Sequence, residues 1–122
     1  MVSMSSKPVK TKPQYYAVIL NPLQKIAKKH GYNLVVHGSM KRDLDLIAIP
    51  WSDNTSSHLT VLQHMSKYLG ADVYDSLEYY QLRRLPGGRQ SYIINLHRRG
   101  ARNKYKSDAQ YYLDISFTPF IQ

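Results

Sequence analysis

The chain has 122 residues, enough for one hydrophobic core and too few for two domains of ordinary size. It contains no cysteine, which excludes a disulfide framework and a cysteine-based zinc site. Its formal net charge of +9 at pH 7 predicts an anionic partner, such as nucleotide phosphates, nucleic acid or an acidic protein surface.

The same features predict a cytoplasmic protein without a membrane partner. The first 13 residues lack the apolar centre of a signal peptide, and every apolar run is far shorter than a membrane span. The absence of cysteine suits a reducing compartment.

We expect residues 1–13, which are Ser, Lys and Pro without apolar periodicity, to form a flexible basic leader. From Gln14 to His30 apolar residues recur at spacings of three and four, which predicts an amphipathic helix. Pro22 leaves two possibilities: a helix that begins there with Asn21 as its N-cap, or one helix that continues through the proline with a kink. Gly31 ends the pattern.

Two short β-rich runs follow, Asn33–His37 and Asp43–Ile49, joined by a turn over 38–42. The connection is short enough for the two strands to lie antiparallel. Thr55 and Ser56 are then candidate caps of a second helix, whose apolar stripe comprises Leu59, Leu62, Met65 and Leu69.

The last third changes to strand patterns. Residues 75–85 are rich in Tyr and ambiguous, and Pro86-Gly87-Gly88 is a turn signal. Runs 90–97 and 111–117 read as strands on either side of the polar, basic loop 98–110. Residues 14–122 therefore predict a single α+β domain with a mixed or antiparallel sheet and helices packed on one face.

Two aspartates stand in the run that otherwise looks most like core. Strand side chains alternate, so Asp43 and Asp45 point to one face while Leu44, Leu46 and Ala48 point to the other. Two carboxylates this close repel each other, and burial would raise the pKa of at least one unless a cation neutralises them. Mg²⁺ or Mn²⁺, which prefer carboxylate and phosphate oxygens, would do so.

Gly38 and Ser39 supply the other half of such a site, because a glycine lets the backbone approach a ligand and free N–H groups beside a hydroxyl hold phosphate oxygens. A third carboxylate is expected from a neighbouring strand. Asp114 is the candidate, since Leu113, Ile115 and Phe117 alternate with it.

With Gly38-Ser39, Asp43-Leu44-Asp45 and Asp114, the chain resembles the nucleotidyltransferase superfamily related to DNA polymerase β. The stretch HGSMKRDLDLIAIPW (37–51) is also similar to small nucleotidyltransferase-like proteins of bacteriophages and bacteria. The resemblance covers roughly residues 20–51 and the last strand, and it implies a minimal nucleotidyltransferase fold.

The resemblance also implies a role for each residue. Gly38 and Ser39 would bind the triphosphate, while Asp43, Asp45 and Asp114 would bind two Mg²⁺ ions as a hydroxyl attacks the α-phosphate and pyrophosphate leaves. Between Ser39 and Asp43 lie three residues, fewer than in most members of the superfamily. Two of them, Lys41 and Arg42, would add positive charge at the phosphates.

Other readings of the sequence stay open. Asp43 and Asp45 are also compatible with a solvent-facing edge strand, and a degenerate member of the fold would bind a nucleotide, nucleic acid or protein without chemistry. The segment Arg98 to Lys106 is either a contact surface for a nucleic-acid or protein acceptor or a loop of solvated charges. Charge alone also allows a nucleic-acid-binding protein without a nucleotide site, and the oligomeric state is open.

Overall fold

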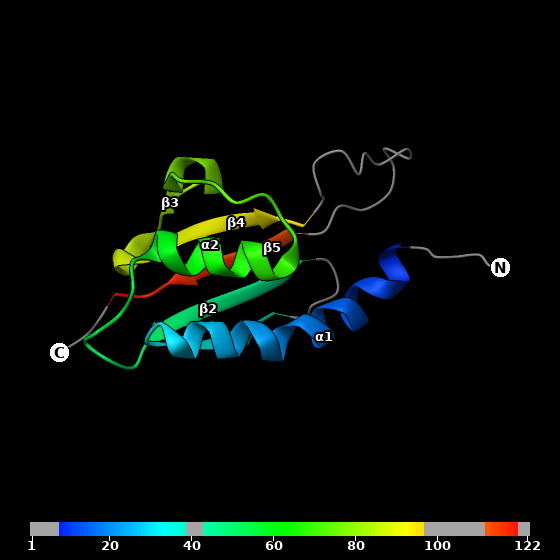
Figure 1. The fold of residues 1–122 in the computed structure, drawn as a ribbon, viewed down its shortest axis with the longest axis horizontal. Coiled ribbons are helices and arrows are strands. Elements are labelled where there is room, and N and C mark those ends of the chain that lie inside the picture. Colours follow the sequence, from blue (N-terminus) through cyan, green and yellow to red (C-terminus); the bar gives the residue numbers. More distant parts are fainter. Residues whose placement is uncertain (1–7, 39–42, 97–111, 120–122) are drawn as a thin grey trace.

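The computed structural model describes residues 8–38, 43–96 and 112–119. Within these residues two α-helices and a mixed five-stranded sheet confirm the α+β class. Figure 1 shows how they are arranged. In chain order the elements are α1 (Pro8–Lys29), β1 (Tyr32–His37), β2 (Leu44–Pro50), α2 (His58–Leu69), β3 (Arg83–Arg84), β4 (Gln90–Asn95) and β5 (Tyr112–Phe117).

Helix α1 corrects the predicted leader, because it begins at Pro8 rather than at Gln14. Proline is well tolerated at the first helical position, where its missing N–H would have no intrahelical partner. The helix also continues through Pro22, so Asn21 is not a cap. Buried side chains on both sides of Pro22 belong to one apolar stripe, and their packing offsets the hydrogen bond that the proline removes: Tyr16, Ile19, Leu23 and Ala27. Residues 1–7 lie outside the described part of the chain.

The strands lie in the order β1-β2-β5-β4-β3. Strands β1 and β2 are antiparallel, as their short connection predicts, and β4 is antiparallel to both β5 and β3. Strand β5 instead pairs parallel to β2. A parallel pair needs a long connection, and here α2 and the β3–β4 hairpin lie between the two strands in the sequence. Because β2 is paired on both sides, the edge-strand reading of its aspartates is wrong.

Helix α2 is capped one or two residues later than expected. The Ser57 hydroxyl oxygen accepts a hydrogen bond from the N–H of Thr60, at 3.2 Å. The hydroxyl of Ser56, one of the two expected caps, lies instead 2.7 Å from Nδ1 of His30, at the end of α1. The ambiguous stretch 75–85 holds a short 3₁₀ turn at Leu77–Tyr80 and then β3.

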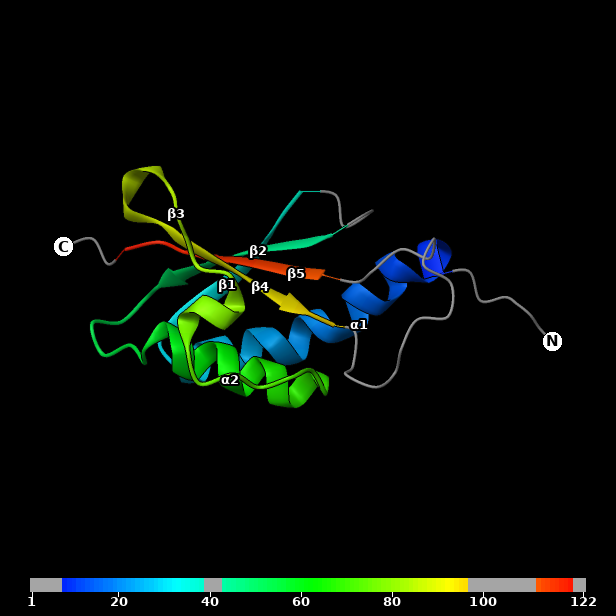
Figure 2. The same cartoon turned by 90° about the horizontal axis from the view of Figure 1, so that it is seen from above.

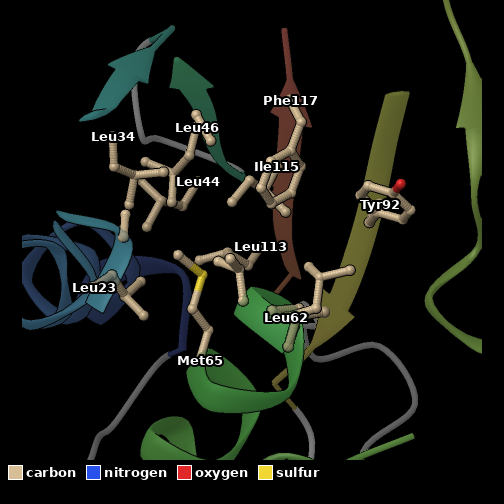
Figure 3. Packing of buried hydrophobic residues seen from close by; sticks show 14 of the residues in the cluster. Leu23, Leu34, Leu44, Leu46, Leu62, Met65, Tyr92, Leu113, Ile115 and Phe117 are labelled. Carbon is tan, nitrogen blue, oxygen red and sulfur yellow. The ribbon is translucent and has the colours of Figure 1, made fainter. Parts of the chain in front are cut away.

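Both helices pack on the same face of the sheet, as Figure 2 shows. Their buried side chains meet those of the strands in one core, part of which is drawn in Figure 3. The sheet contributes alternate residues to this core: Tyr32, Leu34, Leu44, Leu46, Ala48, Tyr92, Ile94, Leu113, Ile115 and Phe117. The other set of strand side chains points away from the helices.

Candidate functional site

The face of the sheet opposite the helices carries two rows of side chains that run across the strands. Register pairing gives the first row as His37, Asp45, Asp114 and Ile93, and the second as Val35, Ile47, Ser116, Ser91 and Arg83. We call this surface the open face. Both central positions of the first row are carboxylates.

Asp45 and Asp114 are direct register partners in the parallel pair β2–β5. Neighbouring strands lie about 4.8 Å apart, so the two carboxylates stand side by side. This placement confirms that Asp114 lies on the strand adjacent to that of Asp45. Asp43 lies just before β2 and is exposed, so it borders the pair at the start of that strand.

Burial and the charge of Asp43 raise the pKa of both carboxyl groups. The pKa of Asp45 is raised first by burial, then by the charges of Asp114 and Asp43, while His37 opposes the rise. Burial also raises the pKa of Asp114, against the opposing charge of Arg83, whose Nη2 lies 3.7 Å from Asp114 Oδ2. Ionisation of these carboxyl groups therefore costs free energy, and a bound cation would offset that cost.

Gly38 lies beside Asp45 at the end of β1. Its φ of +96° is a left-handed conformation that other residues adopt with strain, and a Cβ added there would lie 3.5 Å from Asp45 Oδ2. The glycine therefore leaves the carboxylate accessible from the β1 side. The other expected phosphate-binding residues, Ser39, Lys41 and Arg42, lie outside the described residues.

A pocket of about 180 Å³ opens over the centre of these rows. Asp45, Asp114, Leu46 and Ile47 belong to its lining at the two central strands, together with Ser116. His37 lines it from the β1 side, and Arg89 from the hairpin that joins β3 to β4. The pocket is thus bordered by carboxylates in its floor and by cationic or ionisable groups on two sides.

Arg83 and Arg89 are site residues that sequence analysis did not identify. They flank the Pro86-Gly87-Gly88 turn. The pairing of Arg83 with Ser91 places Arg83 at the β3 end of the second row, and Arg89 lines the pocket. Their signal in the sequence is the turn itself, because a tight turn between two short strands places its flanking residues together. The turn signal does not predict which strand of the sheet the hairpin pairs with.

The oxygen donors of this site fit a Mg²⁺ ion that binds a phosphate group as well as the protein carboxylates. In the described part of the chain, no group of three or more His, Asp or Glu side chains is arranged to hold a metal by itself. Mg²⁺ is usually held by one or two carboxylates, with water and substrate phosphates completing its coordination. Asp45 and Asp114 supply such a pair, and Asp43 is close enough for its charge to act on both.

Comparisons with known proteins identify no relative, so a functional assignment depends on this geometry. No protein-family model matches the chain, and a search of curated proteins finds no match. Among the described residues, neither helix combines the length and apolar character needed to cross a bilayer. The basic segment 98–106, expected to contact an acceptor, lies outside the described residues.

Proposed function

We propose that the chain is a minimal nucleotidyltransferase, which moves a nucleoside monophosphate from a nucleoside triphosphate to a hydroxyl group in the presence of Mg²⁺. The observation that carries this proposal is the register pairing of Asp45 with Asp114 on an accessible sheet face, beside the positive-φ Gly38. A cytoplasmic location, where nucleoside triphosphates are abundant, fits the cysteine-free composition.

The residues divide the reaction between them. The turn at Gly38 and Ser39, with Lys41 and Arg42, binds the phosphates that leave. Mg²⁺, when bound to the carboxylates, neutralises charge that develops on the entering and leaving oxygens. Asp45 lies on the side of the leaving group and Asp114 on the opposite side, where it orients the hydroxyl that attacks.

The bond changes are those of an in-line displacement. The hydroxyl oxygen forms a bond to the α-phosphorus, and the bond from that phosphorus to the bridging oxygen of pyrophosphate breaks. The hydroxyl proton passes to Asp114 or to water, and pyrophosphate leaves on the Gly38 side. The register of β2 and β5 sets the spacing of the two carboxylates before a substrate binds, which supports this division of roles.

Thermal unfolding with each of the four ribonucleoside triphosphates, with and without Mg²⁺, tests the site. We expect at least one triphosphate to raise the melting temperature in a Mg²⁺-dependent way, because a ligand at about 100 times its Kd stabilises the native state by about 2.7 kcal/mol. Asp45→Asn should abolish this rise. Pyrophosphate release would then be measured with the triphosphate that binds.

Asp53→Asn is the matched control, since it removes an exposed carboxylate from the loop after β2. Its ligand-induced rise should equal that of the wild type. The comparison uses the rise and not the melting temperature itself, because Asp45→Asn also changes the stability of the free protein. An equal Mg²⁺-dependent rise in Asp45→Asn and wild type would refute the proposed site.

A further inference from the structure

Two histidine rings meet on the side of the sheet that carries the helices, away from the open face. His30 follows the last residue of α1, and His64 lies on α2. Nε2 of His30 lies 3.2 Å from Nδ1 of His64, and the two rings stand edge to face with centroids 4.7 Å apart. The residues are 34 positions apart in the chain, so only the packing of the helices brings them together.

The ring of His30 is oriented by Ser56. Nδ1 of His30 lies 2.7 Å from the Ser56 hydroxyl oxygen. Ser56 is itself fixed by its backbone, because its N–H donates to the His30 carbonyl at 3.0 Å and its carbonyl accepts a hydrogen bond from the hydroxyl of buried Tyr32, also at 3.0 Å. When the Nδ1–H of His30 donates to Ser56, Nε2 keeps its lone pair on the side of His64.

Gly31 allows the segment that carries Ser56 to approach this ring. Its φ is +94°, and a Cβ added there would lie 3.0 Å from Cγ2 of Thr55 and 3.2 Å from the carbonyl oxygen of Asn54. Residues 54–56 therefore pack directly on the turn that follows α1. This backbone packing sets the position of the His30 ring before any ligand binds.

The spacing of the two facing nitrogens suits a single metal ion. Zn²⁺ lies about 2.0–2.1 Å from a histidine nitrogen, and in a tetrahedral site two such nitrogens are about 3.3 Å apart. The observed separation between His30 and His64 is 3.2 Å. Without an ion one proton lies between the two nitrogens. If that proton is on Nδ1 of His64, an ion replaces it when the exposed His64 ring gains a proton from water at Nε2, so that the ring stays neutral.

We propose that His30 and His64 together bind one divalent transition-metal ion of the zinc type. Imidazole nitrogen suits Zn²⁺, Ni²⁺ and Cu²⁺, whereas Mg²⁺ prefers oxygen. Among the described residues no group of three or more His, Asp or Glu is arranged around an ion, so water completes the coordination. The bound ion joins the end of α1 to α2, and this role is independent of the nucleotide chemistry proposed for the open face.

Thermal unfolding in increasing concentrations of ZnCl₂ tests the site. At about ten times the Kd we expect the melting temperature to rise by about 3–6 °C, because an ion that binds the native state stabilises it. His64→Gln should abolish this rise, and the exposed position of the ring makes the variant compatible with the fold. An equal rise in His64→Gln and wild type would overturn the inference.

His37→Gln is the matched control, since it removes another exposed histidine, from the open face. The zinc-dependent rise should be retained in this variant and in Asp45→Asn. Loss of the rise in either one would assign the ion to the open-face carboxylates and overturn the inference. Triphosphate binding with Mg²⁺ should be unchanged in His64→Gln, so the proposed function and this site succeed or fail in separate measurements.

Isothermal titration calorimetry with ZnCl₂ gives the second readout. We expect one ion per chain, and His30→Gln/His64→Gln should lose no more affinity than either single variant, because both rings serve the same ion. Ser56→Ala, which releases the His30 ring, should weaken binding about tenfold. One ion per two chains, or losses that add between the single variants, would overturn the inference.

Lys29 provides a test of opposite sign. Burial lowers the pKa of His30, and the charges of His64 and Lys29 lower it further. The ammonium group of Lys29 therefore also opposes a cation bound to this ring. In the same titration at low salt, Lys29→Gln should strengthen zinc binding about two- to fivefold, as expected when one exposed charge is removed. Weaker binding in Lys29→Gln would overturn the assignment of the ion to His30.

Discussion

The two faces of strand β5 differ in what they contribute. Leu113, Ile115 and Phe117 are completely buried against the helices, whereas Asp114 and Ser116, which stand between them, are half-buried on the open face. Strand β2 repeats this division. The same backbone hydrogen bonds therefore hold a hydrophobic core on one side and a carboxylate pair on the other, so that stability and chemistry depend on different side chains of one strand.

The largest expected effect distinguishes Phe117 from Ser116, which are neighbours on opposite faces of β5. Phe117 stacks on His58, with ring centroids 4.1 Å apart, and makes edge contacts with Tyr32 and Tyr92. Phe117→Ala should lower the free energy of unfolding by about 3–5 kcal/mol. Ser116→Ala should change it by less than about 0.5 kcal/mol. Urea unfolding measures both, and similar losses would mean that the open face is also part of the core.

Acid should weaken the helix-covered face first. His58 lies half-buried with Nδ1 2.7 Å from the Tyr92 hydroxyl, and burial lowers its pKa against the opposing hydrogen bond with Gln90. Burial likewise lowers the pKa of His30. A lowered pKa favours the neutral ring in the folded state, so its contribution is complete above the unfolded value of about 6.5 and is lost as the pH falls below it.

We therefore expect the melting temperature to decrease between about pH 7.5 and pH 5.5. His58→Gln should start from a lower melting temperature and show a shallower decrease, because one of the two groups no longer titrates. A profile as steep as that of the wild type would exclude His58 as a source of the acid sensitivity.

The smallest expected change is a gain of stability on the open face. Because the pKa of Asp45 is raised in the folded state, its contribution is favourable at low pH and is lost as the pH rises through the folded value. At pH 7 the ionised group is therefore a cost, which Asp45→Asn removes. The melting temperature without ligand should increase by about 2–4 °C, while Asp53→Asn should leave it unchanged. A decrease in Asp45→Asn would show that the carboxylate stabilises the fold.

Much of the fold is readable from local pattern. Alternation assigned Asp45 and Asp114 to the polar face of their strands, and the short connection from β1 to β2 predicted their antiparallel pairing. The start of α1 differs from the prediction because the polar, proline-containing segment from Pro8 lacks the apolar periodicity that marks the rest of the helix. Ser57 and not Ser56 caps α2, because the Ser56 hydroxyl is hydrogen-bonded to His30, far away in the sequence.

By itself the sequence determined which side chains share a face, since the strand period of two depends on the backbone alone. Only the tertiary structure decided which strands are neighbours. The parallel pairing of β2 and β5 brings together Asp45 and Asp114, and the β3–β4 hairpin brings Arg89 to the pocket and Arg83 to within 3.7 Å of Asp114. These contacts join segments far apart in the chain, and their order follows from how the sheet packs on both helices, which no local pattern encodes.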